Sequence, residues 1–457
     1  MQVRTHPARR RRPAVDAHPS AGAHAAEGAH AARRMRRVRR MHHVRLVAAL
    51  AALTALTAAT AGTAEAAPAR PVAAPSGLAT SDPAPPGDAF YTPPDPLPAG
   101  APGDVIRSRP SKAGPPTARR LADAWQVMYL STDALGRPDA VTGTVLVPKN
   151  ADRAKAPIIG WGPGTSGPAF QCAPSKFIDE GAFYEQSALN EMLQAGYAVA
   201  VPDYEGYHAD PKTTYVAGKS MGPALMDAVR AAQRLPDAGL SKDAKVVFRG
   251  YSQGGGAAMW AGQLQPAYAP ELNLVGVVGG GVPANLALVA LGLEGKKPFG
   301  FLLDALIGLD NAYPELNLAS YLNDAGKAAV AGMQQHDCTL ELLLNYPGKK
   351  VADYFTTNPL GTKPWADRVT ENRLGGTPIK VPVLQYHSDA DEIVAFNQAN
   401  TLRQQYCTEG VPLTWKVWNG LSHITLVYRG NADAMAFIAD RLAGKPATSN
   451  CPTTPSS

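Results

Sequence analysis

The sequence predicts an α/β fold: a mainly parallel β-sheet with helices on both of its faces, interrupted by one helical insertion. Two observations support this prediction. Short apolar runs alternate with segments of helical periodicity over most of the chain, which is typical of parallel strands joined by crossover helices. One long stretch, residues 284–365, has no strand signal, and its apolar residues recur at helical spacing.

The first 66 residues have the features of an export leader. Twelve arginines stand against three acidic residues, and the last basic run precedes the apolar stretch "LVAALAALTALTAATAG" and the small-residue pattern Ala64-Glu65-Ala66. The apolar stretch is short for a membrane span. Residues 1–66 are therefore predicted to be a signal segment, and the protein to be secreted with no stable membrane span; a retained N-terminal anchor is the disfavoured alternative.

The formal net charge of +6 comes from this leader, because residues 67–457 carry −3. A slightly acidic body argues against binding a phosphate backbone, so no nucleic-acid partner is expected. Residues 67–103 are rich in Pro, Ala and Gly and predict a linker and N-terminal arm.

The predicted core has two parts, residues 104–283 and 366–457. Near its start, "WQVMYLSTDALGRPDAVTGTVLVP" predicts two strands joined by a Gly-Arg-Pro turn. Further strands are expected in short apolar runs that look buried on both faces. These runs are "APIIGWG", "GYAVAVPD", "AKVVFRG", "LNLVGVVGG", "VPVLQYH" and "LTWKVWNG". The segments between them with helical periodicity are "YEQSALNEMLQAG", "ALMDAVRAAQRL", "GAAMWAGQLQPAY", "FNQANTLRQQYC" and "ADAMAFIADRLAG".

Residues 284–365, between the two parts of the core, are predicted to form a helical cap. The segments "FGFLLDALIGL" and "LNLASYL" show the helical spacing. Long insertions commonly serve as lids over active sites, which favours a cap over plain core helices.

Four cysteines follow the leader, and an even number in an exported protein predicts two disulfides with three possible pairings. They are Cys172, Cys338, Cys407 and Cys451. Their spacing contains no CxxC and there is no HExxH, so no metal site is expected. No GxGxxG opens a helix after the first strand and no GxxxxGK[ST] occurs, so no nucleotide cofactor is expected.

Two segments match Gly-x-Ser-x-Gly, "GKSMG" around Ser220 and "GYSQG" around Ser252. A nucleophile elbow needs a strand directly before the serine and a helix directly after it. Ser252 follows the strand-like "KVVFRG" and precedes the helix-like "GAAMWAGQLQ". The segment before Ser220 resembles a loop, so Ser220 is predicted to cap the next helix. Ser252 is the candidate nucleophile, and the backbone N–H of Gln253 is a candidate oxyanion donor.

A serine nucleophile needs a base and an acid that orients the base. Four histidines follow the leader: His208, His336, His387 and His423. His423 follows the last predicted strand, which is where this strand and helix order places the base. The acid is expected after a strand between serine and histidine, and "SDADEIV" offers Asp389, Asp391 and Glu392 without deciding among them.

With these residues in place, the chain resembles the Candida antarctica lipase A-like secretory lipase family of fungi and actinobacteria. The resemblance runs from about residue 90 to Cys451, and the matching motifs are "PDYEG", "GYSQGG", "YAPELNLVG", "DEIV" and "SHIT". It implies an α/β-hydrolase fold with an inserted helical cap, acting on carboxylic esters that include acylglycerols.

The resemblance also implies roles for individual residues. It selects Asp391 as the triad acid and suggests the disulfides Cys172–Cys338 and Cys407–Cys451. It places the second oxyanion donor at Asp203, whose carboxylate must then turn away or be protonated, because a charged carboxylate would repel an oxyanion. The general hydrolase rule points instead to the loop "WGPGTSG".

The sequence therefore predicts a secreted serine carboxylester hydrolase, a lipase or esterase, whose partner is an acyl ester or lipid substrate. An acyltransferase or a peptidase would use the same triad. A non-catalytic lipid-binding homologue of the same fold is a further alternative, since fold alone does not prove function. The oligomeric state stays open.

Overall fold

A computed structural model describes residues 85–452 of the 457-residue chain. The predicted signal segment, residues 1–66, and residues 67–84 of the predicted linker lie outside the described residues. Within the arm, a short 3₁₀ helix at Gly87–Tyr91 buries Phe90 and Tyr91 against the core. None of the helices in the described part of the chain is long and apolar enough to cross a membrane.

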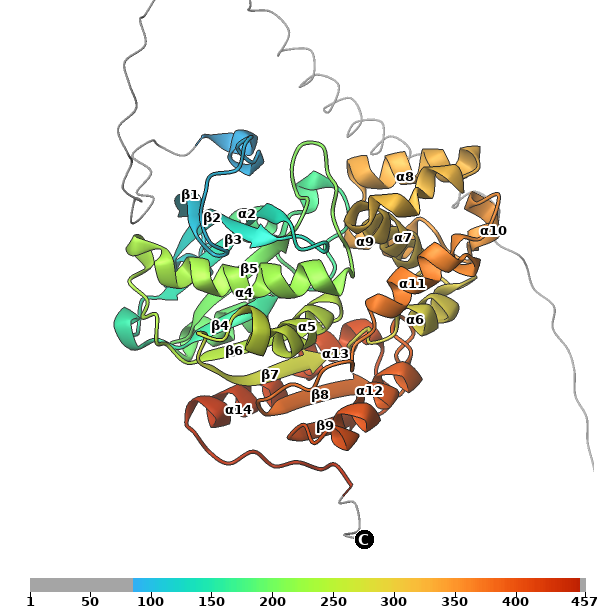
Figure 1. Cartoon of the computed structure of the whole chain (residues 1–457). Coiled ribbons are helices and arrows are strands. Elements are labelled where there is room, and N and C mark those ends of the chain that lie inside the picture. Colours follow the sequence, from blue (N-terminus) through green and yellow to red (C-terminus); the bar gives the residue numbers. More distant parts are fainter. Residues whose placement is uncertain (1–84, 453–457) are drawn as a thin grey trace, which may run out of the picture. The chain divides into compact units, whose positions relative to one another are not determined.

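Within residues 85–452, nine strands form one mixed, mainly parallel sheet in the order β1-β2-β3-β5-β4-β6-β7-β8-β9 (Figure 1). The first four in this order pair antiparallel, and the pairs from β5 to β9 are parallel. The strands are β1 (Val105–Ser111), β2 (Ala122–Thr132), β3 (Pro138–Pro148), β4 (Ile158–Gly162), β5 (Ala198–Tyr204), β6 (Val246–Tyr251), β7 (Leu274–Gly280), β8 (Val383–Ser388) and β9 (Leu413–Trp418). The predicted fold class is confirmed.

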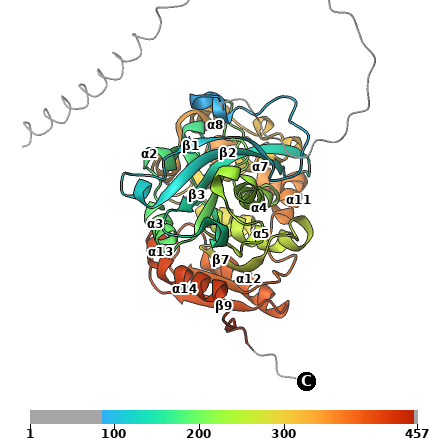
Figure 2. The same ribbon diagram turned by 90° about the vertical axis from the view of Figure 1, so that its left-hand side faces the viewer.

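Helices cover both faces of the sheet, as Figure 2 shows. Successive residues of a strand point to opposite faces, so neighbouring residues of β4 pack in different apolar clusters. Ile158 packs in one apolar cluster with α4 (Gly218–Arg234), α5 (Gln253–Tyr268) and α12 (Phe396–Thr408). Ile159 packs in a second cluster on the other face. The helices of that face are α3 (Gln186–Gln194), α13 (His423–Arg429) and α14 (Asn431–Leu442), with the short α2 (Pro174–Glu180) near β3 and β5.

Three details differ from the sequence prediction. Strand β1 was not predicted, because its residues are mostly polar and half-buried and the strand is held by pairing with β2. Ser220 is not a helix cap: α4 begins at Gly218, and Ser220 Oγ donates to Glu205 at 2.5 Å. The segment "LNLASYL" forms no α-helix: its residues Leu318–Ser320 make a 3₁₀ turn, since Asn317 directly before the turn adopts φ 48°.

The segment between β7 and β8 is helical and supplies most of a third apolar cluster, to which Val216 and Val394 of the core also belong. Its helices are α6 (Leu286–Leu293), α7 (Gly300–Ala312), α8 (Asp324–His336), α9 (Thr339–Leu344), α10 (Val351–Tyr354) and α11 (Lys363–Glu371). Helix α11 contributes Trp365 and Val369 to this cluster, so the helical segment continues past the expected boundary at residue 365. We call residues 284–371 the cap.

Both disulfides expected from the resemblance are present. Cys172–Cys338 joins the region after β4 to the cap, where Thr339 N also donates to Ser166 O. Cys407–Cys451 holds the C-terminal tail beside the edge strand β9. There the Asn450 side chain exchanges hydrogen bonds with the Trp415 backbone at 2.8 Å, which covers part of an otherwise unpaired sheet edge.

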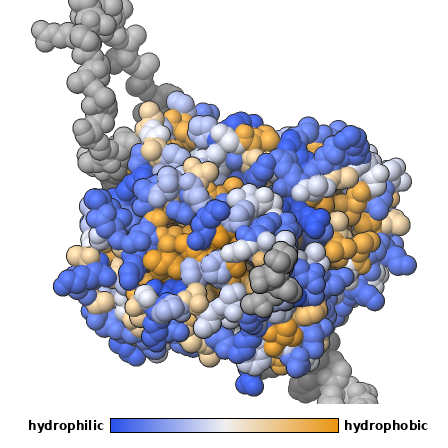
Figure 3. All heavy atoms as spheres, turned by 60° about the horizontal axis from the view of Figure 1, so that its bottom comes forward, coloured by the Kyte–Doolittle hydropathy of each residue, from blue (hydrophilic) through white to orange (hydrophobic). Residues whose placement is uncertain are grey.

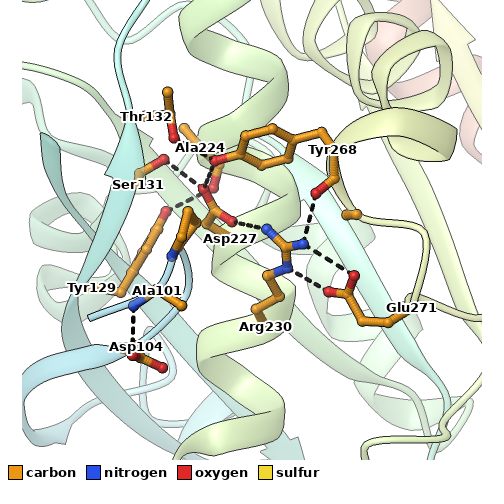
Figure 4. Close-up of polar contacts among 12 residues, drawn as sticks. Ala101, Asp104, Tyr129, Ser131, Thr132, Ala224, Asp227, Arg230, Tyr268 and Glu271 are labelled. Carbon is orange, nitrogen blue, oxygen red and sulfur yellow. Dashed lines mark hydrogen bonds and ion pairs between the residues drawn. The ribbon is translucent and has the colours of Figure 1, made fainter. Parts of the chain in front are cut away.

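A buried polar network ties β2 to α4 and α5 (Figure 4). The carboxylate of Asp227 on α4 accepts from Ser131 Oγ at 2.8 Å, from Tyr268 OH at 2.7 Å and from Arg230 Nη1 at 2.8 Å. Arg230 also binds Glu271 at 2.6 Å. Because Asp227 is fully buried, its charge is tolerated only while these donors stay in place.

Replacing Asp227 by alanine should therefore destabilise the fold strongly. The change leaves the buried Arg230 without one of its two carboxylates, and breaking a buried pair typically costs about 3–5 kcal/mol. The measurement is the free energy of unfolding in urea. Asp243→Ala is the matched control, since its pair with Lys242 is exposed, and it should leave the unfolding midpoint unchanged. Equal midpoints for both variants would contradict a structural role for the network.

Candidate active site

Ser252 lies on the sharp turn between β6 and α5, as predicted for a nucleophile elbow. Its backbone has φ 57° and ψ −123°, a conformation that side-chain-bearing residues rarely adopt. Such strain costs about 1–3 kcal/mol and persists only where surrounding structure imposes it. Here the neighbouring strands impose the strained conformation of Ser252, because β6 pairs in parallel with β4 on one side and with β7 on the other.

The glycines of the motif are required by close approach of backbone to backbone. A Cβ on Gly254 would lie 1.9 Å from the carbonyl oxygen of Gly162 at the end of β4. A Cβ on Gly250 would lie 2.2 Å from the backbone of Gly254. The elbow therefore fits against β4 only when both positions lack a side chain.

His423 is the first residue of α13, after the last strand, with Ser422 as the N-cap. Its ring lies 4.9 Å from that of Tyr251, whose hydroxyl donates to the His423 carbonyl at 2.8 Å. Ser252 and His423 line the same cavity, with no direct hydrogen bond between them in the described part of the chain. Catalytic hydrogen bonds often tighten only when substrate binds.

Asp391 is the acid that reaches the imidazole. Its Oδ2 lies 2.6 Å from His423 Nδ1, and its Oδ1 accepts from the backbone N–H groups of Ile393 and Val394 at 3.0 and 2.7 Å. Burial alone would raise the pKa of Asp391, but His423, His387 and the backbone N–H of Val394 together outweigh burial, and the pKa lies below its usual value. The carboxylate is therefore ionised at neutral pH.

The other two acids of the turn bind the same loop differently. Asp389 Oδ1 accepts from Gly420 N at 2.7 Å, and Glu392 Oε2 accepts from the backbone N–H of His423 at 2.9 Å. Neither touches the imidazole ring. Among the remaining histidines, His208 and His336 do not line the cavity, and His387 is buried beside Asp391 at 3.4 Å.

The two oxyanion candidates differ in how the structure places them. Gln253 is the first residue of α5, next to Ser252. Asp203 is fully buried at the end of β5, and its carboxylate accepts from Ser175 N and Oγ at 2.6 Å and from Thr142 Oγ1 at 2.7 Å. These contacts occupy the carboxylate, which meets the condition for a backbone role, but Asp203 does not line the cavity. Its role stays a prediction.

The alternative loop, residues 161–167, lies directly against the elbow. Its Gly164 N–H donates to the buried Glu185 at 2.9 Å, and burial raises the pKa of Glu185 to about 7. Thr165 from this loop lines the cavity. No pattern in the sequence predicts a role for Tyr251 or Glu185 at this site. Tyr251 lies inside the quoted motif, but its contact with His423 joins positions 172 residues apart.

A cavity of about 300 Å³ opens at Ser252 and His423. Its walls come from α6, α7 and α9 of the cap, from α13 and from the turn that carries Asp391, and they consist mainly of aliphatic side chains. The arrangement places a serine, a histidine bonded to a carboxylate, and a helix N-terminus at the mouth of an apolar space. Such a set can attack an acyl carbonyl and stabilise the resulting oxyanion.

Comparison with known proteins gives consistent matches. Residues 175–450 match the model of the secretory lipase family. Lipase 6 of Candida albicans is 31% identical over 395 residues, covering 80% of this chain and 83% of that protein. The secreted triacylglycerol lipase LIP3 of Malassezia restricta is 30% identical, covering 79% and 80%. The crystal structure of Candida antarctica lipase A is 28% identical with a TM-score of 0.73, covering 80% of this chain and 88% of that one.

The elbow geometry predicts opposite effects of alanine at two nearby glycines. Gly254→Ala should destabilise the protein by at least about 1–3 kcal/mol, because the new Cβ overlaps the Gly162 backbone. Gly256→Ala places its Cβ 3.4 Å from Pro283, an ordinary contact, and should keep or raise stability by helix propensity. Thermal unfolding of both purified variants is the measurement, and a tolerated Gly254→Ala would refute the packing account.

Proposed function

The chain belongs to the secretory lipase family, and we propose that it is a secreted serine hydrolase that cleaves carboxylic esters through an acyl-enzyme on Ser252. Relatives include secreted triacylglycerol lipases, in agreement with the export leader and the ester hydrolase activity predicted from the sequence. One observation carries the proposal: the elbow Ser252 and the Asp391-bound His423 share one apolar cavity.

The proposed reaction follows from these positions. His423 takes the proton from Ser252 Oγ as that oxygen attacks the acyl carbonyl, and then gives it to the departing alcohol. Water attacks the resulting acyl-enzyme with His423 again as base, which releases the acid and restores Ser252. Asp391 orients the imidazole and stabilises it while it is charged. The first N–H groups of α5, beginning with Gln253, face the developing oxyanion, and Asp203 is the proposed second backbone donor.

The cavity supports an acyl chain as the bound group. Aliphatic walls favour burial of methylene groups, each worth about 0.8 kcal/mol, and provide few partners for a peptide backbone. Exposed apolar side chains also lie on α6, α9 and α13, three helices that line the cavity, which suits contact with a lipid surface. They are Leu291, Leu340, Leu344, Ile424 and Tyr428. Figure 3 shows apolar areas (orange) among hydrophilic ones on one face of the molecule.

Ser252→Ala should abolish ester hydrolysis. Removal of a triad member typically costs on the order of 10⁴-fold or more in kcat. The assay is hydrolysis of p-nitrophenyl esters with acyl chains of about two to sixteen carbons by the mature protein; a peak at long chains supports a lipase and one at short chains an esterase. Ser220→Ala is the matched control, since the second Gly-x-Ser-x-Gly serine does not line the cavity, and it should retain activity.

Two results would contradict this proposal. Hydrolysis that survives in Ser252→Ala would remove this serine as the nucleophile. A wild-type protein with both disulfides formed that cleaves none of the esters would favour the non-catalytic lipid-binding alternative.

Three amide substitutions test the choice of acid. Asp391→Asn should lower kcat by about 10⁴-fold, because an amide presents the wrong partner to the imidazole N–H. Asp389→Asn and Glu392→Gln alter contacts to the loop backbone only and should lose far less. The measurement is kcat for each variant with a single ester, and a larger loss in either of the last two would reassign the acid.

A further inference from the structure

A second imidazole reaches the carboxylate of Asp391. His387 lies near the end of β8 and is fully buried. Its Nε2 lies 2.7 Å from the carbonyl oxygen of Val394 and 3.4 Å from Asp391 Oδ2. Two imidazole rings therefore lie near Oδ2 of the triad acid: His423 is its hydrogen-bond partner at 2.6 Å, and His387 lies 3.4 Å away.

The neighbours decide the proton positions on this ring. A carbonyl oxygen only accepts, so the 2.7 Å contact with Val394 requires that Nε2 carries the proton. Nδ1 is then unprotonated, and it has no hydrogen-bond partner among residues 85–452. Burial lowers the pKa of His387, which the nearby charge of Asp391 only partly opposes, so the ring is neutral at neutral pH.

His387 also completes a closed set of contacts around the acid. Val394 N donates to Asp391 Oδ1 at 2.7 Å, while Val394 O accepts from His387. Both oxygens of the carboxylate are thereby fixed with respect to one backbone turn. Because Ile393 and Val394 line the cavity, the same imidazole fixes part of the wall beside the reacting atoms.

We propose that His387 is a positioning residue of this site: its Nε2–H binds Val394 O and so clamps the turn of residues 391–394, and Nε2 lies 3.4 Å from Asp391 Oδ2, so that the positive end of the same N–H dipole is near the carboxylate without a hydrogen bond to it. The proposal rests on the proposed function for its role in catalysis. It does not require His387 to touch the substrate, and His387 does not line the cavity.

The charges around His387 determine the direction in which the titration of His423 moves when His387 is replaced. The groups that face His387 are Asp391 from its own turn and His423 from α13, and Glu392 lies beyond them on the His423 backbone N–H. The neutral His387 ring makes no ion pair with Asp391, but the positive end of its Nε2–H dipole partly offsets the carboxylate charge that acts on His423. When this N–H is removed, the charge of Asp391 stabilises the protonated form of His423 more strongly. The titration of His423 should then move to higher pH by about half a unit, a small shift that fits the loss of one neutral N–H dipole.

The test compares three variants by NMR titration of the His423 ring and by the pH dependence of kcat/KM. His387→Phe removes the donor and keeps a buried ring; the titration and the acid limb of kcat/KM should rise by about half a pH unit, with kcat lower on the order of tenfold and KM little changed. His387→Gln places an amide N–H near the position of Nε2, and should restore most of the wild-type titration of His423 and most of kcat. If the Phe variant does not fold, His387→Asn replaces it, because its shorter side chain cannot reach Val394.

Gln385→Met is the matched control. Gln385 is buried on the same face of β8, and its hydrogen bond to Ala399 O lies away from Asp391. It can affect stability but should leave the His423 titration unchanged. A titration that stays in place or moves to lower pH in His387→Phe, or that moves equally in Gln385→Met, would overturn the proposal.

The proposed ester hydrolysis and the proposed role of His387 can be refuted independently of each other. The NMR titration reports on His387 whether or not the protein cleaves esters. Inactive wild-type protein would therefore contradict the proposed function and leave the His387 result to be judged on the titration alone.

Discussion

The close approach of β4 to the first turn of α5 is the constraint on which the site depends. The backbones of Gly162 and Gly254 lie so near each other that no side chain fits between them, and this contact holds Ser252 in its strained conformation. A parallel sheet makes it possible, since β4, β6 and β7 end at the same edge. The helix that follows then starts at the serine, so that its N–H groups and positive dipole end lie where an oxyanion would form.

His423 is held in place by a short polar turn at the end of β8. Ser388 Oγ donates to Leu421 O at 2.6 Å, Asp389 accepts from Gly420 N, Asp391 binds the His423 ring, and Glu392 accepts from the His423 backbone. Four of five consecutive residues thus hold one loop. Only the contact of Asp391 reaches the imidazole; the others fix the loop, which explains why three neighbouring acids serve different purposes.

The cap completes the site by supplying apolar walls. Two links join the cap to the region after β4: the Cys172–Cys338 disulfide and the hydrogen bond that Thr339 N donates to Ser166 O. That region also carries Gly164 and Thr165, next to the elbow. Cap position and active-site geometry are therefore coupled through one short segment. The buried Glu185 fixes this segment by accepting a hydrogen bond from Gly164 N–H.

Local pattern in the sequence determined the fold class, the elbow at Ser252 and the position of His423, because hydrophobic period and glycine spacing express backbone geometry over a few residues. The polar strand β1 escaped prediction, since its partner β2 holds it in place, and Ser220 was misplaced because its bond to Glu205 forms across a loop. Spacing left Asp389, Asp391 and Glu392 equivalent; they differ by side-chain direction, which depends on how β8 packs against α13. Tertiary structure alone brought His387 to Asp391 and Tyr251 to His423, because such contacts join segments whose separation in the chain carries no periodic signal.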